Sequence, residues 1–280
     1  MALALAACAP TPDPAHPALW RVDGPQGQRG WLFGTIHALP RPVLWRSATV
    51  DAALASSDRL VLEVARIDDD KAIARKFAEL SHTPGQPSLD ARIAPALRPA
   101  LDRLLAEERL DPAQFGDTET WAAALALAQH LERRVGNDSG NGIDRALLRA
   151  VPGKPVAEFE GADAQFATFD RLPEAAQREL LAAIVSGANT AQDDTLRLAK
   201  AWRSGDMAAI EADTRAGLLA WPDLREALFV ARNRAWVGQL AAMLDHRQHP
   251  FVAVGAAHMA GPAGLPAMLT QRGYRVTRLQ

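Results

Sequence analysis

The hydrophobic positions along the chain fall into a few short runs separated by long stretches of helical spacing. The short runs are rich in Val, Leu and Phe, and they predict β-strands, because runs of this length and composition are typical of a buried sheet. The predicted strands span residues 19–23, 30–35, 59–65, 154–160, 251–257 and 274–279. The first two flank a turn rich in Gly and Pro, which predicts a hairpin.

Between the strands, apolar positions recur with the period of a helix. Residues 47–58 predict a helix with Ser47 as its N-cap, and residues 223–247 predict one long amphipathic helix. Two long stretches of helical spacing lie between the strands, and we call them the helical excursions. They cover about residues 67–149 and 163–247. The pattern predicts an α/β fold, with α+β as the alternative. We expect a small central sheet with helices packed on it and two long helical insertions.

Composition narrows the possible functions. The chain has 280 residues, of which 48% are hydrophobic, so a sizeable core can be buried. The formal net charge is -2 and no run of Lys and Arg occurs, which argues against a nucleic-acid partner. No apolar run approaches the roughly 20 residues that a membrane-spanning helix needs.

Residues 1–17 predict a tail that precedes a single domain over residues 18–280. The stretch LAAC ends at Cys8 and is followed by a Pro-rich segment, which resembles the end of a bacterial lipoprotein signal, where a lipid is joined to the cysteine. A basic start is missing and the apolar part is short, so an unstructured tail with an idle cysteine is the alternative. The lipoprotein interpretation predicts a location in the bacterial cell envelope, periplasmic or exported, with Cys8 as the only membrane anchor.

Two of the predicted strands end in the same Gly-x-x-His pattern. Gly34 is followed by His37, and Gly255 by His258. One such pattern more often marks a turn with a structural histidine than a site. Ligands in open α/β sheets bind beyond the carboxyl ends of the strands. Two copies in matching contexts therefore favour one shared functional site.

Two glutamates accompany these histidines. Glu63 interrupts the apolar run 59–65, and Glu160 ends the run 154–160. A buried carboxylate is costly unless it is paired, hydrogen-bonded or bound to a metal. Glu63 therefore predicts either a structural ion pair, with Arg232 as the candidate partner, or a functional carboxylate.

Two chemistries are open for His37, His258 and Glu63. Two histidines and a carboxylate form a common ligand set for a divalent transition metal such as manganese, cobalt, zinc or iron. Alternatively, Glu63 is a general base that activates a water held between the histidines. The sequence leaves both roles of Glu63 open.

Taken together, these motifs resemble the TraB/GumN family. The resemblance covers the chain after about Ala18. It rests on the two Gly-x-x-His patterns, the glutamate in LVLEV, the segments GIDRALL and KPVAEFEGADAQFATFDRLP, the pair Arg232 and Asn233, and the closing segment VAVGAAHMAGPAGLPAMLTQRGYRVTRL.

The resemblance implies a fold like that of erythromycin esterases and ChaN-like haem-binding proteins. It also implies kinship with TIKI proteins, which are membrane-associated, metal-dependent proteases that clip Wnt signals. Two histidines and a strand glutamate are held to form the TIKI active centre, and these positions match His37, His258 and Glu63. Arg232 and Asn233 match the family's Arg-Asn pair, which we expect to contact an anion or the substrate.

Glu160 is expected, with Asn233, among the substrate contacts, although Gly161 follows it where relatives often have Thr. The glycines of the two motifs, Gly34 and Gly255, are expected to let the chain turn sharply at the end of each strand.

The site and the resemblance together predict a metal-dependent hydrolase that cleaves a peptide or a related amide or ester bond in the bacterial envelope. Arg232 would stabilise the developing oxyanion. Catalytic roles are predicted for His37, Glu63, Arg232 and His258.

Two alternatives stay open. The first is a non-catalytic protein that binds or sequesters a peptide signal, a metal or haem. The second is a factor in exopolysaccharide production. Glu63 and Glu160 would suit a sugar-cleaving pair of carboxylates, but the paired histidines would then lack a purpose.

Overall fold

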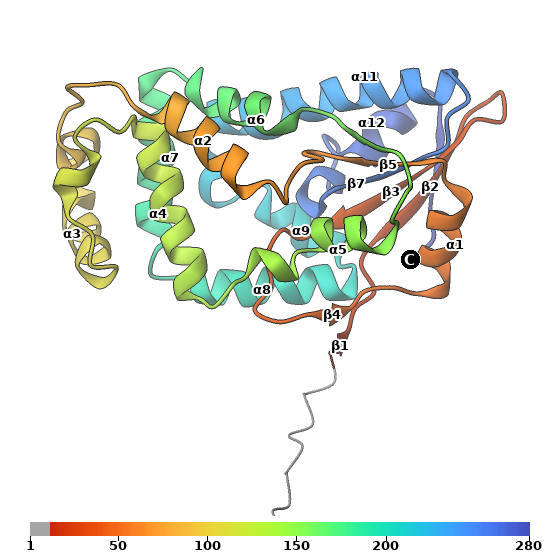
Figure 1. The fold of residues 1–280 in the computed structure, drawn as a ribbon, viewed down its shortest axis with the longest axis horizontal. Helices are drawn as coiled ribbons and strands as arrows, with labels where there is room; N and C mark the ends of the chain where they lie inside the picture. The colour runs from red at the N-terminus through yellow and green to blue at the C-terminus, as the bar shows by residue number, and fades with distance from the viewer. Residues whose placement is uncertain (1–11) are drawn as a thin grey trace, which may run out of the picture.

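A computed structural model of the chain describes residues 12–280. It has a central mixed sheet with helices packed around it, which confirms the predicted α/β fold (Figure 1). Cys8 lies outside the described residues, so its lipidation stays a prediction. Within residues 12–280, none of the helices combines the length and the apolar character that a bilayer crossing requires.

Six strands form the central sheet in the order β6-β5-β7-β3-β2-β8. Their bounds are β2 (Leu19–Asp23), β3 (Arg29–Thr35), β5 (Arg59–Leu62), β6 (Val156–Glu158), β7 (Pro250–Gly255) and β8 (Arg275–Arg278). Strands β3, β5, β6 and β7 are parallel, and β2 pairs antiparallel with both β3 and β8. Two further short strands, β1 (Asp13–Pro14) and β4 (Val43–Leu44), pair with each other.

Alternate side chains of the strands enter two different cores, because successive residues of a strand point to opposite faces. Phe33 and Phe251 belong to the core on one face, and their neighbours Leu32 and Val252 to the core on the other. The first face is covered by α1 (Ala48–Ser56), α5 (Ile143–Ala150), α8 (Ala191–Ser204) and α9 (Met207–Asp213). The second is covered by α11 (Ala231–Asp245) and α12 (Leu265–Gln271).

A third core contains helical and loop residues but no strand residue. It is built by α2 (Asp70–Ser81), α3 (Arg98–Glu107), α4 (Thr120–Arg134), α6 (Gly161–Asp170), α7 (Glu174–Gly187) and α10 (Pro222–Arg225). Trp121 lies at its centre, fully buried against Phe77 and Phe169. The two helical excursions thus pack on each other, and α3, α4 and α7 lie at a distance from the sheet (Figure 1).

The prediction of one continuous helix over residues 223–247 is wrong in one respect, because the observed helix is interrupted. A π-helical turn spans Glu226–Val230, between the end of α10 and the start of α11. Such turns are frequent at functional sites. One inserted residue changes the hydrophobic periodicity of a long helical segment too little to be detected, so the sequence did not predict this turn.

The strand predicted over residues 59–65 is shorter than expected. β5 ends at Leu62, so Glu63 is the first residue beyond the strand and does not lie inside it. Its backbone carbonyl accepts the N–H groups of Glu160 and Gly161, which come from the loop after β6. The chain therefore leaves the regular strand geometry where Glu63 turns toward the site.

Candidate functional site

The residues that the sequence analysis selected lie together at the carboxyl edge of the parallel strands. His37 follows β3, Glu63 follows β5 and Glu160 follows β6. His258 lies in a 3₁₀ turn directly after β7. The two Gly-x-x-His patterns are neighbours, because β3 and β7 pair in parallel with Thr35 opposite Gly255.

His37 is held from behind by Asp144. The His37 Nδ1 atom lies 2.8 Å from Asp144 Oδ2, and the Thr35 hydroxyl donates to Asp144 Oδ1 at 2.8 Å. A carboxylate in this position keeps a proton on Nδ1 and directs Nε2 toward the site. The negative charge of Asp144 and its hydrogen bond to Nδ1 raise the pKa of His37 to about 10. His37 therefore carries a positive charge at neutral pH.

Asp144 is a site residue that the sequence analysis missed. It lies in the first turn of α5, within the GIDRALL segment, and is 8% exposed. A signal was present, because Asp144 shares the buried stripe of this helix with Ile143 and Leu147. A carboxylate on the apolar stripe of a helix needs a partner, and here the partner is His37.

The motif glycines are needed for close approach and do not make sharp turns, which corrects the expectation above. Neither Gly34 nor Gly255 has a positive φ. A Cβ on Gly34 would lie 3.1 Å from the Ala256 Cβ atom. A Cβ on Gly255 would lie 3.2 Å from His37 Nε2 and 3.4 Å from Glu63 Oε1.

Gly142 makes a still closer approach to the site. A Cβ there would lie 2.2 Å from the His37 carbonyl oxygen. The next residue, Ile143, donates its backbone N–H to the Ile36 carbonyl at 2.9 Å. The segment GIDRALL therefore packs its glycine and its aspartate against the loop that carries His37.

Glu63 is almost fully buried and both of its carboxylate oxygens are occupied. The backbone N–H of Gly255 donates to Oε1 at 2.8 Å, and Arg232 Nη2 donates to Oε2 at 2.9 Å. Burial would raise the pKa of Glu63. The positive charges of His37 and Arg232, that of His258 below its own pKa of about 4, and the Gly255 hydrogen bond outweigh that effect and lower the pKa to about 2.

Arg232 joins Glu63 to Glu160. Its Nε donates to Glu160 Oε1 at 2.9 Å and its Nη2 to Oε2 at 3.0 Å. The Trp236 indole N–H donates to the same Oε1 at 2.9 Å, and the guanidinium lies 4.7 Å from the Trp236 ring centroid. The fourth partner of Arg232 is the Leu228 carbonyl in the π-helical turn, at 3.1 Å.

His258 is buried and held by Asn233. Asn233 Nδ2 donates to the Ala263 carbonyl at 2.7 Å, so its Oδ1 accepts from His258 Nδ1 at 2.6 Å. The His258 Nε2 atom then faces Arg232 Nη1 at 3.4 Å. Burial lowers the pKa of His258 to about 4, so the ring is neutral at pH 7.

Asn233 and Glu160 therefore lie at the site, and their contact with a substrate stays a prediction. Asn233 is fully buried, and the Glu160 side chain is 11% exposed. Their polar atoms are used by His258, Arg232 and Trp236. In the structure both side chains hold other residues of the site in place.

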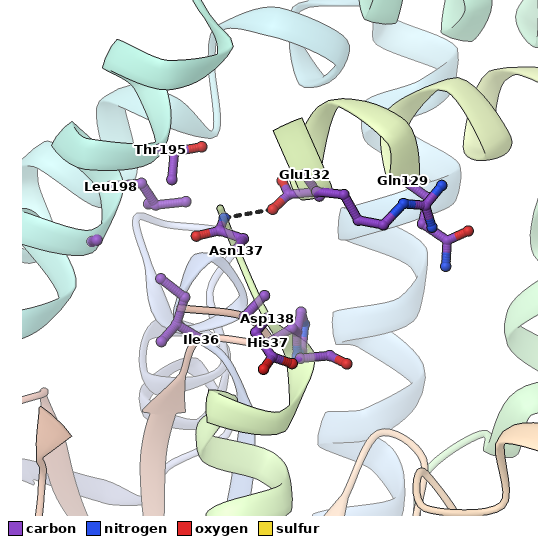
Figure 2. Close-up of a pocket in the computed structure, with 12 residues that line it drawn as sticks. Ile36, His37, Gln129, Glu132, Asn137, Asp138, Thr195 and Leu198 are labelled. Carbon is purple, nitrogen blue, oxygen red and sulfur yellow. Dashed lines mark hydrogen bonds between the residues drawn. The ribbon is translucent and has the colours of Figure 1, made fainter. Parts of the chain in front are cut away.

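His37 lies between two cavities. The smaller one, about 220 Å³, also contains Glu63, Asp144, Arg145 and Gln165, and we call it the chamber. The larger one, about 790 Å³, lies on the other side of His37 between the end of α4 and α8, and we call it the groove (Figure 2). The His37 side chain is 64% exposed and lines both cavities, so a ligand in either cavity can contact it.

The two histidines suit a divalent metal only in part. Asp144 and Asn233 bind the Nδ1 atoms of His37 and His258, respectively. Each Nε2 is then free to coordinate a metal ion. However, Arg232 occupies Glu63 Oε2 and faces His258 Nε2. Over residues 12–280, no three His, Cys, Asp or Glu side chains lie close enough together to hold an ion. As arranged here the residues do not fit a bound metal, and the metal dependence that the resemblance implies stays a prediction.

A protonated histidine, His37, and an ionised carboxylate, Glu63, lie close together at the site. His37 Nε2 and Glu63 Oε1 are 3.9 Å apart, which is too long for a direct hydrogen bond and short enough for one water to bridge them. His37 is protonated and Glu63 ionised at neutral pH, as their pKa values of about 10 and about 2 require. A proton donor and a carboxylate acceptor thus face one water-sized position.

Comparison with known proteins agrees with the motifs. The model of the TraB/PrgY/gumN family matches residues 18–278, which include every site residue described above except the lipidation candidate Cys8. No curated protein and no solved structure matches the chain. With nearly its whole length covered by the family model, the chain belongs to the TraB/PrgY/gumN family.

Proposed function

We propose that the chain is a hydrolase that cleaves a peptide or a related amide or ester bond, with Glu63 and His37 as its base and acid. The observation that carries this proposal is the 3.9 Å separation of His37 Nε2 and Glu63 Oε1, with each group fixed from behind. An acid and a base held at one water-sized position are what hydrolysis of a carbonyl compound requires.

In the proposed reaction, a water between the two groups attacks the carbonyl carbon of the substrate. Glu63 takes a proton from that water, and His37 donates its Nε2 proton to the leaving nitrogen or oxygen. Return of the proton from Glu63 to His37 restores the starting state. A bound substrate excludes water and so raises the pKa of Glu63, which strengthens it as a base.

The surrounding residues support the same roles. Asp144 stabilises the positive charge of His37 before the proton is donated. Arg232 and the Gly255 N–H fix the Glu63 carboxylate so that only Oε1 faces His37. Arg232 is 13% exposed and is engaged by two glutamates, which supports a positioning role rather than direct contact with an oxyanion.

The metal that the family resemblance implies would act as a Lewis acid if Arg232 moved away from Glu63 and His258. No step above depends on it. We also propose that the protein is located in the bacterial envelope and anchored through Cys8. Only the sequence supports this part of the proposal.

A binding protein without turnover is the second candidate, and one observation favours it. Both oxygens of Glu63 already accept hydrogen bonds from Gly255 and Arg232. A carboxylate that is satisfied in this way is a weak base, and the same cavities could retain a peptide without cleaving it.

The test is a screen of fluorogenic peptides and esters with the wild-type protein and with Glu63→Gln. The proposal predicts turnover that Glu63→Gln lowers about 10²–10⁴-fold, the usual contribution of a general base. The matched control is Glu79→Gln, which changes a glutamate on α2 whose side chain is 56% exposed. Equal turnover in wild type and Glu63→Gln would contradict the proposed role of Glu63.

A further inference from the structure

The groove beside His37 extends the site in one direction. It lies between the end of α4, the segment 137–139 and α8, and it shares His37 and Ser139 with the chamber (Figure 2). Its volume of about 790 Å³ is in the range of small-molecule and peptide-side-chain sites. A ligand that occupies the groove is therefore continuous with the bond that His37 and Glu63 would act on.

One polar atom in the groove wall has no partner. Asn137 Nδ2 donates to Glu132 Oε2 at 2.5 Å, whereas Asn137 Oδ1 is buried and has no hydrogen-bond partner among the described residues. In Figure 2 these two amide atoms point in different directions. Leaving a buried acceptor unpaired costs about 1–3 kcal/mol. The site therefore favours a ligand that brings a hydrogen-bond donor to Asn137.

The charged groups of the groove favour a cation. Glu132 and Asp138 line it, and in the described part of the chain neither has an ion-pair partner, since the neighbouring Arg134 pairs with Glu107 instead. Arg133 is the only Lys or Arg among the lining residues. His37 is paired with Asp144, whose Oδ2 lies 2.8 Å from His37 Nδ1. Apart from His37, the groove thus has two acidic side chains, Glu132 and Asp138, and one basic side chain, Arg133.

We propose that the groove is a subsite for a positively charged, donor-bearing group of the substrate, placed near the bond that is cleaved. The group is an ammonium or a guanidinium, supplied by the N-terminus of a peptide or by a basic side chain. Glu132 and Asp138 pair with its charge, and Asn137 Oδ1 accepts one of its N–H groups. This inference rests on the proposed function for the role of His37, but binding to the groove can be measured without turnover.

The test uses fluorescein-labelled octapeptides of Ala and Gly that carry one Lys, one norleucine or one Glu, scanned over the positions. Each peptide is made with a free and with an acetylated N-terminus, which distinguishes the two sources of the positive charge. Binding is measured by fluorescence anisotropy to Glu63→Gln, so that cleavage does not interfere. We expect the best Lys or free-amine peptide to bind at least tenfold more tightly than its neutral counterpart, and the Glu peptide to bind most weakly.

Two sets of variants locate this preference. Combining Glu132→Gln with Asp138→Asn should reduce the preference for Lys to less than twofold while the chain stays folded. Thr195→Trp fills the groove from α8 and should weaken all peptides. Leu196→Trp, on the same helix at a residue that is 57% exposed and outside the groove, should change nothing.

The outcomes separate this inference from the proposed hydrolase. A Lys preference that disappears in the double variant supports the subsite even if the wild-type protein cleaves none of the peptides. Cleavage without any charge preference supports the hydrolase and overturns the subsite. Equal or tighter binding of the Glu peptides, a preference that survives in the double variant, or no binding of any peptide would also overturn it.

Discussion

His37 Nε2 lies 3.9 Å from Glu63 Oε1, and the two groups are held from different elements by Asp144 and Arg232. His37 follows β3 and Glu63 follows β5, with β7 between these strands in the sheet. Gly255 ends β7, leaves room for both side chains and donates its N–H to Glu63. The separation is therefore set just beyond the ends of three neighbouring strands.

Asp144→Asn should return the pKa of His37 from about 10 toward its ordinary value, because the ion pair is lost while the shape of the side chain is kept. Histidine titration by NMR measures this directly. We also expect the cleavage rate to fall about 10²–10⁴-fold at pH 8, where His37 would no longer be protonated. An unchanged His37 titration would show that Asp144 does not control its charge.

Arg232→Met should destabilise the fold by about 3–5 kcal/mol at pH 7, because Glu63 and Glu160 would both lose their cation while buried. Urea unfolding at pH 7 measures this loss. Arg232→Lys should restore only part of it, since an ammonium cannot reproduce the paired contacts to Glu160. Adding Glu63→Gln and Glu160→Gln to Arg232→Met should recover stability. A cost below about 1 kcal/mol for Arg232→Met alone would contradict this account.

The stability that Glu63 contributes should depend on pH in one direction. Its pKa in the folded chain, about 2, is below the ordinary value of 4.5, so its contribution is present above pH 4.5 and is lost as the pH falls toward 2. The full difference is on the order of 3 kcal/mol. We expect the gap in unfolding free energy between wild type and Glu63→Gln to narrow as the pH falls from 6 to 3. A gap that stays constant over this range would contradict the lowered pKa.

Gly255→Ala should reduce activity. Its new methyl group would press on the His37 ring and the Glu63 carboxylate, both at 3.4 Å or less, and force them apart. The two side chains must move by a few tenths of an ångström, and overpacking of this kind costs about 1–3 kcal/mol. The control is Gly187→Ala, because nothing lies within 4 Å of a Cβ at that residue. Equal activity of the two variants would be evidence against the close approach.

Metal binding should be controlled by Arg232. The guanidinium takes Glu63 Oε2 and faces His258 Nε2, so its removal frees two of the three predicted donors. We expect Arg232→Met to bind Co²⁺ or Zn²⁺ more tightly than wild type by isothermal titration, and His258→Gln to abolish the gain. One stoichiometric metal ion in the wild-type protein, lost in His37→Ala/His258→Ala, would contradict this arrangement and support the metal that the family resemblance implies.

The hydrophobic pattern could predict the sheet because buried parallel strands carry short apolar runs that few other elements carry. It also indicated the carboxyl edge, since His37 and His258 follow strands directly. The cost of burying Glu63 pointed to Arg232, and the structure contains this ion pair at 2.9 Å. The strands and their carboxyl edge depend on local sequence alone, whereas Arg232 was a candidate partner 169 residues away from Glu63.

The remaining features depend on contacts between distant segments. Asp144 meets His37 only because α5 packs its first turn on the loop after β3. The π-helical turn at Glu226–Val230 does not interrupt the apolar pattern of the segment, yet its Leu228 carbonyl accepts from Arg232. The space that Gly255 leaves is visible only once its neighbours His37 and Glu63 are in place.

The most direct test of the central claim, that His37 and Glu63 form an acid–base pair, compares binding and single-turnover cleavage of the best substrate by wild type and Glu63→Gln. The account predicts that the dissociation constant of Glu63→Gln stays within about threefold of the wild-type value, because the amide preserves the shape of the site. It also predicts that the cleavage rate of Glu63→Gln is lower by at least about 10²-fold. Cleavage by Glu63→Gln at the wild-type rate would contradict the claim. Tight binding by both proteins with cleavage by neither would instead identify a protein that retains its ligand.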